Sequence, residues 1–439
     1  MFSANTVTVI GANGTMGCNV AAIFASFGGA KVYMVSRTLE KSEKAVEKAC
    51  QSVKADSIRE RLLPADYSML EACVLDSELV FEACAEDWNI KTEIHEKIAD
   101  ILKYAKDRKV VCTGTSGLSV TKLAEMYGEE QKKIVFGMHF FNPPYSMTLC
   151  ELIPTIYSDE CMKDEIQEFL SRKIKRAAII VKDVPAFLGN RIGFQFINKA
   201  MQMAETYKYN GGIDYIDAIV GPFTGRAMAP LVTANFVGLD VHKAIVDNLY
   251  QNTSDYANKD FVLPEFCKEL INKGALGRKS GEGLYKVVLN DDGSKKHQVY
   301  DIEHGEYRNV MKYTFSFVET MLAYLKVGNY KAAFEELVQN RSTEAEICCR
   351  FLIDYVVYSL AVSKEVVDNV HAADAAMATG FNWCPPMAIV DAFGGRDCFV
   401  ELCKERLSED ELQKMEFELL IENYEVTEYD YRKFLRAKR

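Results

Sequence analysis

The sequence lacks any apolar run that reaches the roughly 18 residues needed to span a bilayer. Apolar segments such as AAIIV and ELVFEAC are short, as buried strands are. The sequence also lacks a surplus of positive charge, because its net charge is -11 at pH 7. Phosphate binding needs a basic face, which argues against nucleic acid as a main partner. We therefore expect a soluble protein with neither membrane nor nucleic acid as partner.

The cysteines lack a metal-binding pattern. The 13 cysteines are scattered singly, apart from Cys348-Cys349, and no CxxC pair or Cys/His cluster has the spacing of metal ligands. Their odd number and the lack of a signal peptide indicate reduced thiols in a cytoplasm. We expect nearly all of them to be small buried hydrophobic residues, and we expect no metal site.

What the sequence does contain is enough apolar residues for several cores. Its length of 439 residues predicts two or three domains, and 49% of the residues are hydrophobic. Over residues 1–184, short apolar strands alternate with helical stretches, which predicts a doubly wound parallel sheet. The strands are expected at Thr6–Ile10, Lys31–Val35, Glu78–Cys84, Val110–Thr113, Ile134–Met138 and Ala177–Val181, with the first helices at Met16–Phe27 and Leu39–Ala55.

From Pro185 onward the pattern becomes helical. Phe187–Tyr207 reads as one long apolar-striped helix, and a polar stretch, Asn290–Lys296, reads as a linker or hairpin turn. We therefore predict a dinucleotide-binding domain over residues 1–184 and helical domains over residues 185–289 and 290–439.

The two helical regions share a pattern of residues. Pro230 stands eight residues before Gly238, and Pro386 stands eight residues before Gly394. The segments between them, APLVTANFVG and PPMAIVDAFG, have the same apolar pattern. Several such spacings in series favour a duplicated helical unit.

A glycine-rich loop follows the first strand directly. It reads GxxGxxG, one residue longer than the usual GxGxxG, and its Gly11, Gly14, Met16 and Gly17 are candidates for binding a dinucleotide. A tight structural turn would also explain these glycines. The place of the loop at the head of a strand-helix-strand unit favours binding of a pyrophosphate at the helix N-terminus.

The second strand ends without the acid that would bind the ribose of NAD. Ser36 and Arg37 stand there instead. The missing acid removes repulsion against a 2′-phosphate, and Arg37 can pair with such a phosphate. These residues favour NADP but do not exclude NAD, and an exposed arginine at a helix start explains Arg37 as well.

The best candidate for chemistry is His139, with Glu151 twelve residues later. Oxidation of an alcohol by hydride transfer requires a base for the hydroxyl proton, and histidine suits neutral pH. A carboxylate on the second ring nitrogen would fix the tautomer and stabilise the imidazolium. From the residues alone, a histidine at a strand end is more often structural, and the spacing does not place Glu151 beside it.

Several motifs change that balance. HFFNP at His139, the glutamate at 151, DVPAFLGNRI from Asp183, FEACAEDWNIK from Phe81, TGTSGLSV from Thr113 and GALGRKSGEGLYK from Gly274 resemble the signature of the 3-hydroxyacyl-CoA dehydrogenase family. In detail the chain is similar to long bacterial members with two copies of the helical domain, but without the enoyl-CoA hydratase often fused to them. The resemblance covers essentially the whole chain. It implies an α/β Rossmann-type doubly wound sheet followed by two all-α domains like the C-terminal domain of 6-phosphogluconate dehydrogenase.

The resemblance also implies roles for individual residues. His139 matches the catalytic histidine and Glu151 its partner. Ser116 matches the serine that bonds the 3-oxygen of the substrate, and Asn190 the asparagine that steadies the acyl oxygen and the histidine region.

On the cofactor side, Glu86 and Lys91 match residues that lie along the nicotinamide and its ribose. Gly114 departs from the family, which usually has asparagine there. The helical arm that embraces the CoA nucleotide in the family is short in this chain. Its lysines, Lys44, Lys48 and Lys54, are candidates for a CoA phosphate, and a solvated helix face explains them equally well.

We therefore predict an L-3-hydroxyacyl-CoA dehydrogenase that uses NAD or NADP and acts on an acyl-CoA, plausibly a short one such as 3-hydroxybutyryl-CoA. Two alternatives stay open: a dehydrogenase of a free hydroxy acid, and a non-catalytic nucleotide-binding structural protein. A duplicated helical domain would supply an internal pseudo-twofold partner surface, so the protein is expected to be able to exist as a monomer.

Overall fold

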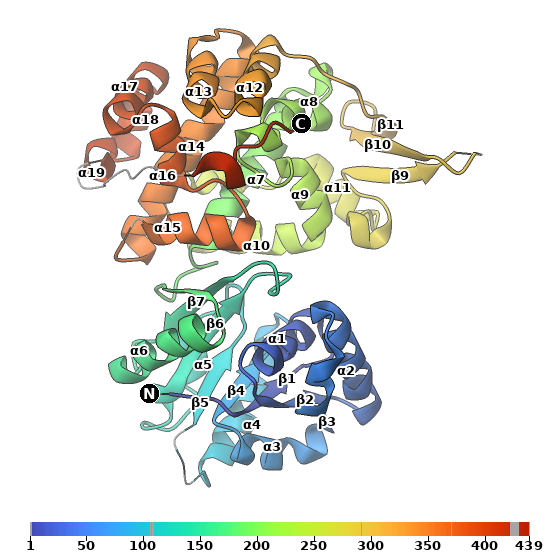
Figure 1. The fold of residues 1–439 in the computed structure, drawn as a ribbon, viewed down its shortest axis with the longest axis vertical. Coiled ribbons are helices and arrows are strands. Elements are labelled where there is room, and N and C mark those ends of the chain that lie inside the picture. The colour runs from blue at the N-terminus through green and yellow to red at the C-terminus, as the bar shows by residue number, and fades with distance from the viewer. Residues whose placement is uncertain are drawn as a thin grey trace. The chain divides into compact units, whose positions relative to one another are not determined.

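The computed structural model describes residues 2–105, 107, 109–290, 292–369, 371–421 and 430–438. The chain forms two compact units, Met1–Phe187 and Leu188–Arg439 (Figure 1). Each unit has its own core and is described by itself. No helix among the described residues is long and apolar enough to cross a membrane.

The first unit is built on an eight-stranded sheet with the order β3-β2-β1-β4-β5-β6-β7-β8. Strands β1 to β6 are parallel to one another, whereas β7 pairs with β6 in antiparallel fashion and with β8 in parallel fashion. The strands are β1 (Thr6–Ile10), β2 (Lys31–Ser36), β3 (Leu62–Asp66), β4 (Leu79–Glu82), β5 (Val110–Thr113), β6 (Val135–Phe140), β7 (Leu149–Pro154) and β8 (Ala177–Ile180).

All six strands expected from the sequence are present, so the doubly wound α/β architecture is confirmed. The sheet contains two further strands, β3 and β7. Strand β3 contains Pro64, which a sheet tolerates at its edge, and β3 is an edge strand. The sheet is parallel from β1 to β6, and β7 and β8 run antiparallel to those strands, because the chain returns from β6 to β7 as a hairpin-like antiparallel pair.

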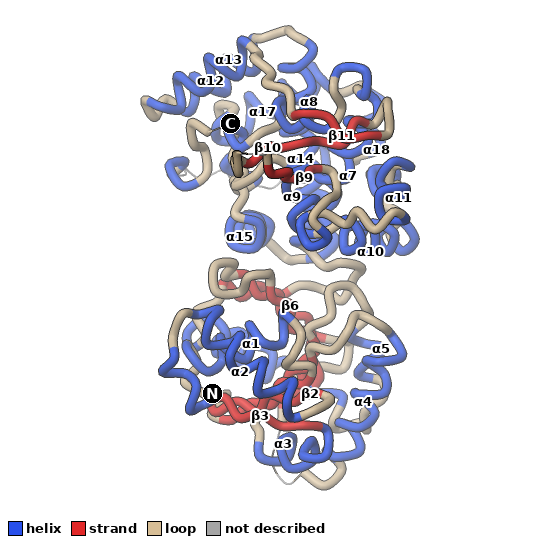
Figure 2. Tube along the Cα trace, turned by 90° about the vertical axis from the view of Figure 1, so that its right-hand side faces the viewer, coloured by secondary structure: helices blue, strands red, loops and turns tan. Residues whose placement is uncertain are grey.

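Helices cover both faces of the sheet (Figure 2). One apolar core joins the sheet to α1 (Thr15–Ser26), α2 (Leu39–Val53) and α6 (Glu160–Glu168). A second core joins the other face to α3 (Leu70–Asp76), α4 (Trp88–Leu102) and α5 (Val120–Ala124). Neighbouring strand residues alternate between the two cores, as the pleat requires: Val9 packs in the first core and Ile10 in the second.

The second unit is mainly helical. Its helices are α7 (Gly189–Thr206), α8 (Ile213–Ile219), α9 (Pro230–Val237), α10 (Leu239–Asn252), α11 (Glu265–Asn272), α12 (Ser316–Lys326), α13 (Tyr330–Gln339), α14 (Thr343–Val366), α15 (His371–Ala376), α16 (Pro386–Ala392), α17 (Arg396–Arg406), α18 (Glu409–Lys414) and α19 (Phe417–Ile421). It also contains an antiparallel sheet of β9 (Tyr285–Leu289), β10 (Lys295–Asp301) and β11 (Glu306–Asn309), which the sequence analysis did not predict. The predicted turn at Asn290–Lys296 connects β9 to β10.

Two helices of this unit begin in the same way. Helices α9 and α16 each have a proline at the first position, and each second residue donates its backbone N–H to a distant aspartate. Leu231 N lies 2.8 Å from Asp217 Oδ1, and Met387 N lies 2.9 Å from Asp374 Oδ1. Each aspartate caps the start of its helix from a distance, because the N-cap residue of that helix makes no side-chain hydrogen bond. This shared contact agrees with the sequence pattern that favours a duplicated helical unit.

The thirteen cysteines are free thiols, as expected for a reduced protein. All are buried except Cys84, Cys161 and Cys398. No group of His, Cys, Asp or Glu side chains suited to a metal ion occurs among the described residues.

Candidate active site

The glycine loop lies at the carboxyl end of β1, where the strand order reverses between β1 and β4. Crevices at such switch points are the usual ligand sites of open α/β sheets. Gly11 has a φ of 79°, and a Cβ there would lie 2.6 Å from the Ala83 carbonyl oxygen. A Cβ on Gly17 would lie 2.5 Å from the Gly11 carbonyl oxygen. Glycine is therefore required at both positions by the packing of the turn.

The same turn presents the start of α1. Helix α1 begins after Gly14 and has no side-chain cap, so the positive end of the helix dipole faces the loop without a protein anion. A pyrophosphate is the type of group that this arrangement binds. The candidate residues Gly11, Gly14, Met16 and Gly17 lie in this loop and in the first turn of α1, and their binding of a dinucleotide stays a prediction.

At the end of β2 the structure places a buried serine and an exposed arginine. The Ser36 hydroxyl is buried and has no hydrogen-bond partner. Arg37 is exposed, and within the described part of the chain it forms no ion pair. The exposed, unpaired guanidinium of Arg37 can reach the ribose side of a dinucleotide at this strand end, whereas the buried Ser36 hydroxyl is shielded from a ligand.

His139 and Glu151 are directly opposite each other on the antiparallel strands β6 and β7. The register explains the twelve-residue spacing, because the chain turns between the strands and brings the two side chains together. His139 Nδ1 lies 2.6 Å from Glu151 Oε2, and both residues are buried. With Nδ1 donating to the carboxylate, Nε2 is the nitrogen left for a substrate, and Nε2 has no hydrogen-bond partner among the described residues.

Two aromatic rings hold the imidazole in place. The Phe141 ring centroid lies 4.7 Å from that of His139, and the Phe187 ring centroid lies 5.6 Å away. Ring contacts and the carboxylate together restrict the rotation of His139. The imidazole is therefore positioned before any substrate arrives.

Glu86 organises the loop after β5. Its Oε1 accepts hydrogen bonds from the Thr115 hydroxyl at 2.6 Å and from the N–H groups of Ser116 at 2.8 Å and Gly117 at 3.1 Å. The Ser116 hydroxyl itself has no hydrogen-bond partner in the described structure. Glu86 thus fixes the backbone that carries Ser116, while the hydroxyl remains available for a ligand.

Beneath this loop lies a buried ion pair. Lys91 Nζ contacts both carboxylate oxygens of Glu82, at 3.0 and 2.9 Å, and lies 3.6 Å from Glu86 Oε2. Burial alone would raise the pKa of Glu82, but His95 at 3.6 Å, Lys91 and the Thr113 hydroxyl lower it to about 2. Lys91 is only 1% exposed, so its ammonium group contacts these carboxylates rather than solvent.

Two features near the site were missed or unexplained by the sequence analysis. Gly114 has a local reason: a Cβ there would lie 2.8 Å from the Phe81 ring, which fills the space. Asp183, quoted only within a motif, accepts hydrogen bonds from the Ser119 hydroxyl and the Val120 and Thr121 N–H groups at 2.7–3.1 Å. It caps the start of α5 from a distance. The aspartate at the start of the DVPAF segment was the sequence signal that could have identified this cap.

The remaining candidate residues are Asn190 and three lysines of the α2 region. Asn190 is buried near the start of α7 and belongs to the second unit, so its role stays a prediction. Lys44, Lys48 and Lys54 are exposed on and just after α2, and Lys44 pairs with Glu40. Helix α2 is followed by a short 3-10 helix, Asp56–Arg61, and then by β3.

Comparison with known proteins gives a consistent family. Residues 6–184 match the model described as 3-hydroxyacyl-CoA dehydrogenase, NAD binding domain, and residues 187–287 match the C-terminal domain of the same family. A probable 3-hydroxyacyl-CoA dehydrogenase of Bacillus subtilis is 27% identical over 326 residues, which cover 73% of this chain and 39% of the relative. A 3-hydroxybutyryl-CoA dehydrogenase of Clostridioides difficile is 29% identical over 295 residues, which cover 64% of this chain and 98% of the relative.

A solved structure matches nearly the whole fold. The 3-hydroxybutyryl-CoA dehydrogenase of Escherichia coli aligns with a TM-score of 0.69 over 96% of each chain, at 20% identity. The chain spans between 39% and 61% of the length of several curated relatives. The two family matches cover adjacent stretches in the expected order. The chain therefore belongs to the 3-hydroxyacyl-CoA dehydrogenase family, with the NAD-binding domain of that family over residues 6–184 and its C-terminal domain over residues 187–287.

Proposed function

We propose that the chain is an L-3-hydroxyacyl-CoA dehydrogenase, which interconverts a 3-hydroxyacyl-CoA and a 3-ketoacyl-CoA. The observation that carries this proposal is the buried His139–Glu151 pair, 2.6 Å apart, on the sheet whose carboxyl edge also carries the glycine loop. A short acyl group such as 3-hydroxybutyryl is favoured by the name of the Clostridioides relative. Family membership alone would not assign these residues, so their roles belong to the proposal.

The proposed chemistry uses His139 as the proton-transfer group. The glycine loop would hold NAD, which when bound would supply the hydride acceptor for C3 of the hydroxyacyl group. In that direction His139 Nε2 takes the proton of the 3-hydroxyl, and Glu151 stabilises the imidazolium that results. In the reductive direction the imidazolium returns the proton to the 3-oxygen. The Ser116 hydroxyl, which has no partner among the described residues, donates a hydrogen bond to the same oxygen and orients it.

Glu86 and Lys91 support the residues that carry out this chemistry. Glu86 holds the Ser116 backbone, and Lys91 holds Glu86 and Glu82 from the buried side. Because Lys91 is buried, we assign it an indirect role in shaping the nicotinamide site. Asn190 is proposed, from its match to the family motif, to steady the acyl oxygen.

We propose further that NADP is accepted and preferred. Support comes from Arg37, which is exposed and forms no ion pair within the described structure, and from the absence of an acid at the end of β2. Arg37→Ala should raise the KM for NADPH more than that for NADH. Equal changes for the two cofactors would overturn the preference.

A second candidate function is oxidation of a free hydroxy acid. The short connection between α2 and β3 favours it, because little chain is present there to contact the nucleotide part of CoA. Acetoacetate and acetoacetyl-CoA distinguish the two functions. Turnover of acetoacetate alone would favour the free acid.

We also propose that the second unit is a duplicated helical domain, with a boundary close to residue 290, and that the protein is monomeric. The matched contacts of Asp217 and Asp374 support the duplication. The long helices α7 and α14 pack within one chain, with the Phe196 and Phe351 ring centroids 5.2 Å apart. A sedimentation mass of twice the chain mass of 49.5 kDa would contradict the monomer.

The experiment that tests the activity is an absorbance assay of acetoacetyl-CoA reduction, with NADH and NADPH side by side. We expect turnover with at least one cofactor and a lower KM for NADPH. Activity with neither cofactor, in protein that binds NADH, would overturn the proposed function.

A further inference from the structure

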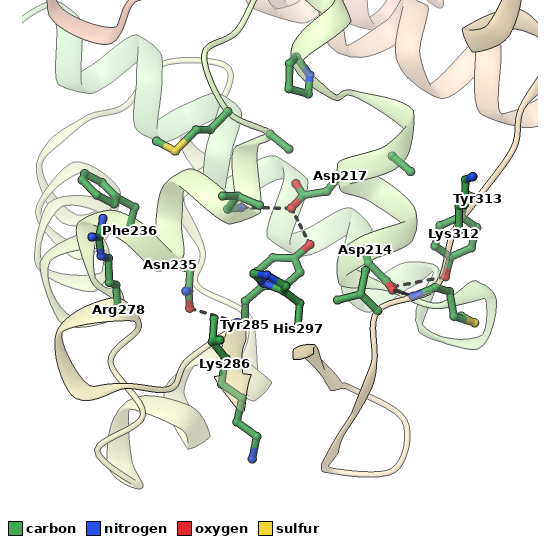
Figure 3. A pocket seen from close by; sticks show the side chains of 18 of the residues that line it. Asp214, Asp217, Asn235, Phe236, Arg278, Tyr285, Lys286, His297, Lys312 and Tyr313 are labelled. Carbon is green, nitrogen blue, oxygen red and sulfur yellow. Dashed lines mark hydrogen bonds between the residues drawn. The ribbon is translucent and has the colours of Figure 1, made fainter. Parts of the chain in front are cut away.

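The second unit contains a pocket of about 980 Å³ that the proposed reaction does not use (Figure 3). It lies among α8, α9, β9, the start of β10 and the segment that follows β11. Small-molecule pockets in proteins hold roughly 300–1,000 Å³, so this one has room for a sizeable ligand. It is formed wholly by residues of the second unit.

The pocket walls are apolar and partly open to water. Five large apolar side chains that line it are well exposed: Val232 at 37%, Phe236 at 46%, Val287 at 50%, Val310 at 40% and Met311 at 45%. Clustered apolar surface of this kind is unfavourable in water and marks binding sites more often than scattered apolar residues do. A ligand with an apolar body would cover it.

The two carboxylates in the lining are already engaged. Asp217 accepts hydrogen bonds from two N–H groups at the start of α9, at 2.8 and 3.1 Å, and from the Tyr285 hydroxyl at 2.7 Å (Figure 3). Asp214 accepts two bonds from Arg308, at 2.7 and 2.9 Å. Burial raises the pKa of Asp217 to about 7, which reduces its repulsion of an anion. Both aspartates hold the framework together rather than recruit a cation.

The remaining charge of the lining is positive. The lining carries four cationic side chains against these two carboxylates: Arg278, Lys286, Lys312 and Lys438. Arg278, Lys312 and Lys438 form no ion pair with any described residue, whereas Lys286 lies 3.8 Å from a carboxylate oxygen of Glu282 and 3.9 Å from the Tyr307 ring centroid. The chain as a whole has a net charge of -11, so a cationic pocket is opposite in sign to its surroundings. Charge of this sign attracts anions.

We propose that this pocket binds an unbranched alkyl chain that ends in an anionic group, a carboxylate or a phosphate. The alkyl chain lies against Val232, Phe236 and Met311, and the anion lies among Arg278, Lys312 and Lys438. An apolar body with one anionic end matches both halves of the lining, whereas a cationic amphiphile matches only the apolar half and a compact anion only the cationic half. This inference does not depend on the proposed dehydrogenase activity.

Calorimetric titration of the full chain with dodecanoate, kept below its critical micelle concentration, tests the proposal. We expect saturable binding of one molecule per chain. Affinity should rise about fourfold per added methylene from octanoate to dodecanoate. Dodecyl phosphate distinguishes a phosphate end from a carboxylate end, since the better match binds more tightly. Dodecylamine binding as tightly as dodecanoate, or no saturable binding of either anion, would overturn the proposal.

Matched variants test whether dodecanoate binds in this pocket. Val232→Trp fills the pocket and should weaken dodecanoate at least about tenfold, because a filled site excludes the chain. Val241→Trp, on α10 outside the pocket and similarly exposed at 40%, should leave affinity unchanged. Lys312→Glu should weaken dodecanoate, whereas Lys326→Glu, an exposed lysine of α12 outside the pocket, should not. Equal effects of a variant and its control would overturn the assignment.

The catalytic site is a separate place where an acyl compound could bind. The KM for acetoacetyl-CoA therefore provides a second reading. We expect Val232→Trp to leave this KM unchanged while it abolishes tight binding of dodecanoate. Competition of acetoacetyl-CoA with dodecanoate in both the unmodified protein and Val232→Trp would show that the alkyl chain occupies the catalytic site instead, and would overturn the proposal.

Discussion

Each unit of the chain buries a carboxylate, and the two carboxylates have different partners. In the first unit Glu82 contacts the Lys91 ammonium at 2.9 Å, and the pKa of Glu82 is lowered to about 2. In the second unit Asp217 contacts only neutral donors, two backbone N–H groups and a tyrosine hydroxyl, and burial raises its pKa to about 7. Neutral dipoles offset the cost of burial less than a full positive charge does.

The difference separates two kinds of framework. Glu82, whose pKa is lowered to about 2, stays charged at neutral pH beside Lys91 beneath the loop that carries Ser116, whereas Asp217 titrates near neutral pH beneath an apolar pocket. The unit that is proposed to carry out proton transfer is thus built on constant charges. The unit with the pocket contains a support whose charge changes with pH.

The largest expected effect comes from removal of the cation in the first unit. Lys91→Met leaves the Glu82 charge buried without its partner and should lower the free energy of unfolding by about 3–5 kcal/mol. Lys97→Met, on the same helix but 51% exposed in its pair with Glu93, should cost about 0–1 kcal/mol. Urea unfolding at neutral pH measures both. Equal small losses would show that Glu82 does not depend on Lys91.

The second expected effect is acid sensitivity of the first unit. The pKa of Glu82 is about 2 in the folded chain and 4.5 ordinarily, so its ionisation stabilises the fold above about pH 4.5. That contribution, on the order of 3 kcal/mol, is lost as the pH falls toward 2. The double variant Glu82→Gln/Lys91→Met should therefore lose less stability on acidification than the unmodified chain. An identical acid dependence in both proteins would contradict the lowered pKa.

Asp217 should show the opposite sign, with a smaller effect. Its folded pKa of about 7 lies above the ordinary 3.8, so its contribution is present below about pH 4 and lost as the pH rises through 7. Over the range from about pH 5 to about pH 8, this titration should lower the free energy of unfolding by about 2–3 kcal/mol. Asp217→Asn should abolish this dependence in unfolding measured from about pH 5 to about pH 8.

Asp374→Asn serves as the matched control for this prediction. It alters the same kind of contact at the start of α16, where Asp374 accepts from Met387 N. Any cost shared by the two variants belongs to the lost helix-start contact. A pH dependence that survives in Asp217→Asn would assign the titration to another group.

The smallest predicted effect concerns the Tyr285 hydroxyl. Tyr285→Phe removes one donor from Asp217 and should cost about 1 kcal/mol at pH 8. Tyr300→Phe on β10 is the control, because no described residue accepts a hydrogen bond from that hydroxyl, and it should cost close to nothing. A larger loss of stability in Tyr300→Phe than in Tyr285→Phe would show that the Tyr285 hydroxyl does not stabilise Asp217.

Much of the fold could be predicted because apolar periodicity and the glycine loop are local signals. The strand Thr6–Ile10 and the loop from Gly11 to Gly17 were read directly from the residues. Strand β3 was missed because Pro64 interrupts its pattern, and β7 was missed because its sequence, LCELIP, also carries the glutamate of the candidate site. The small sheet β9–β11 was missed because apolar and polar residues alternate only weakly along its three strands.

The candidate site was predictable where a motif named the residues and unpredictable where tertiary contacts decide. The spacing of His139 and Glu151 did not itself place them together; only the antiparallel register of β6 and β7 does so. Lys91 of α4 is buried in an ion pair with Glu82 of β4, and no local sequence pattern predicts this tertiary contact. The exchange of asparagine for Gly114 became explicable only with the position of the Phe81 ring.

The most direct test of the central claim is the turnover of His139→Gln. Glutamine can still donate a hydrogen bond to Glu151, so the buried carboxylate keeps a partner while the proton-transfer group is lost. With acetoacetyl-CoA and the better cofactor, kcat should fall about 10²–10⁴-fold. The Kd for NADH should stay within about twofold, since the loss is confined to the chemical step. A kcat within about tenfold of the unmodified chain would contradict proton transfer by His139.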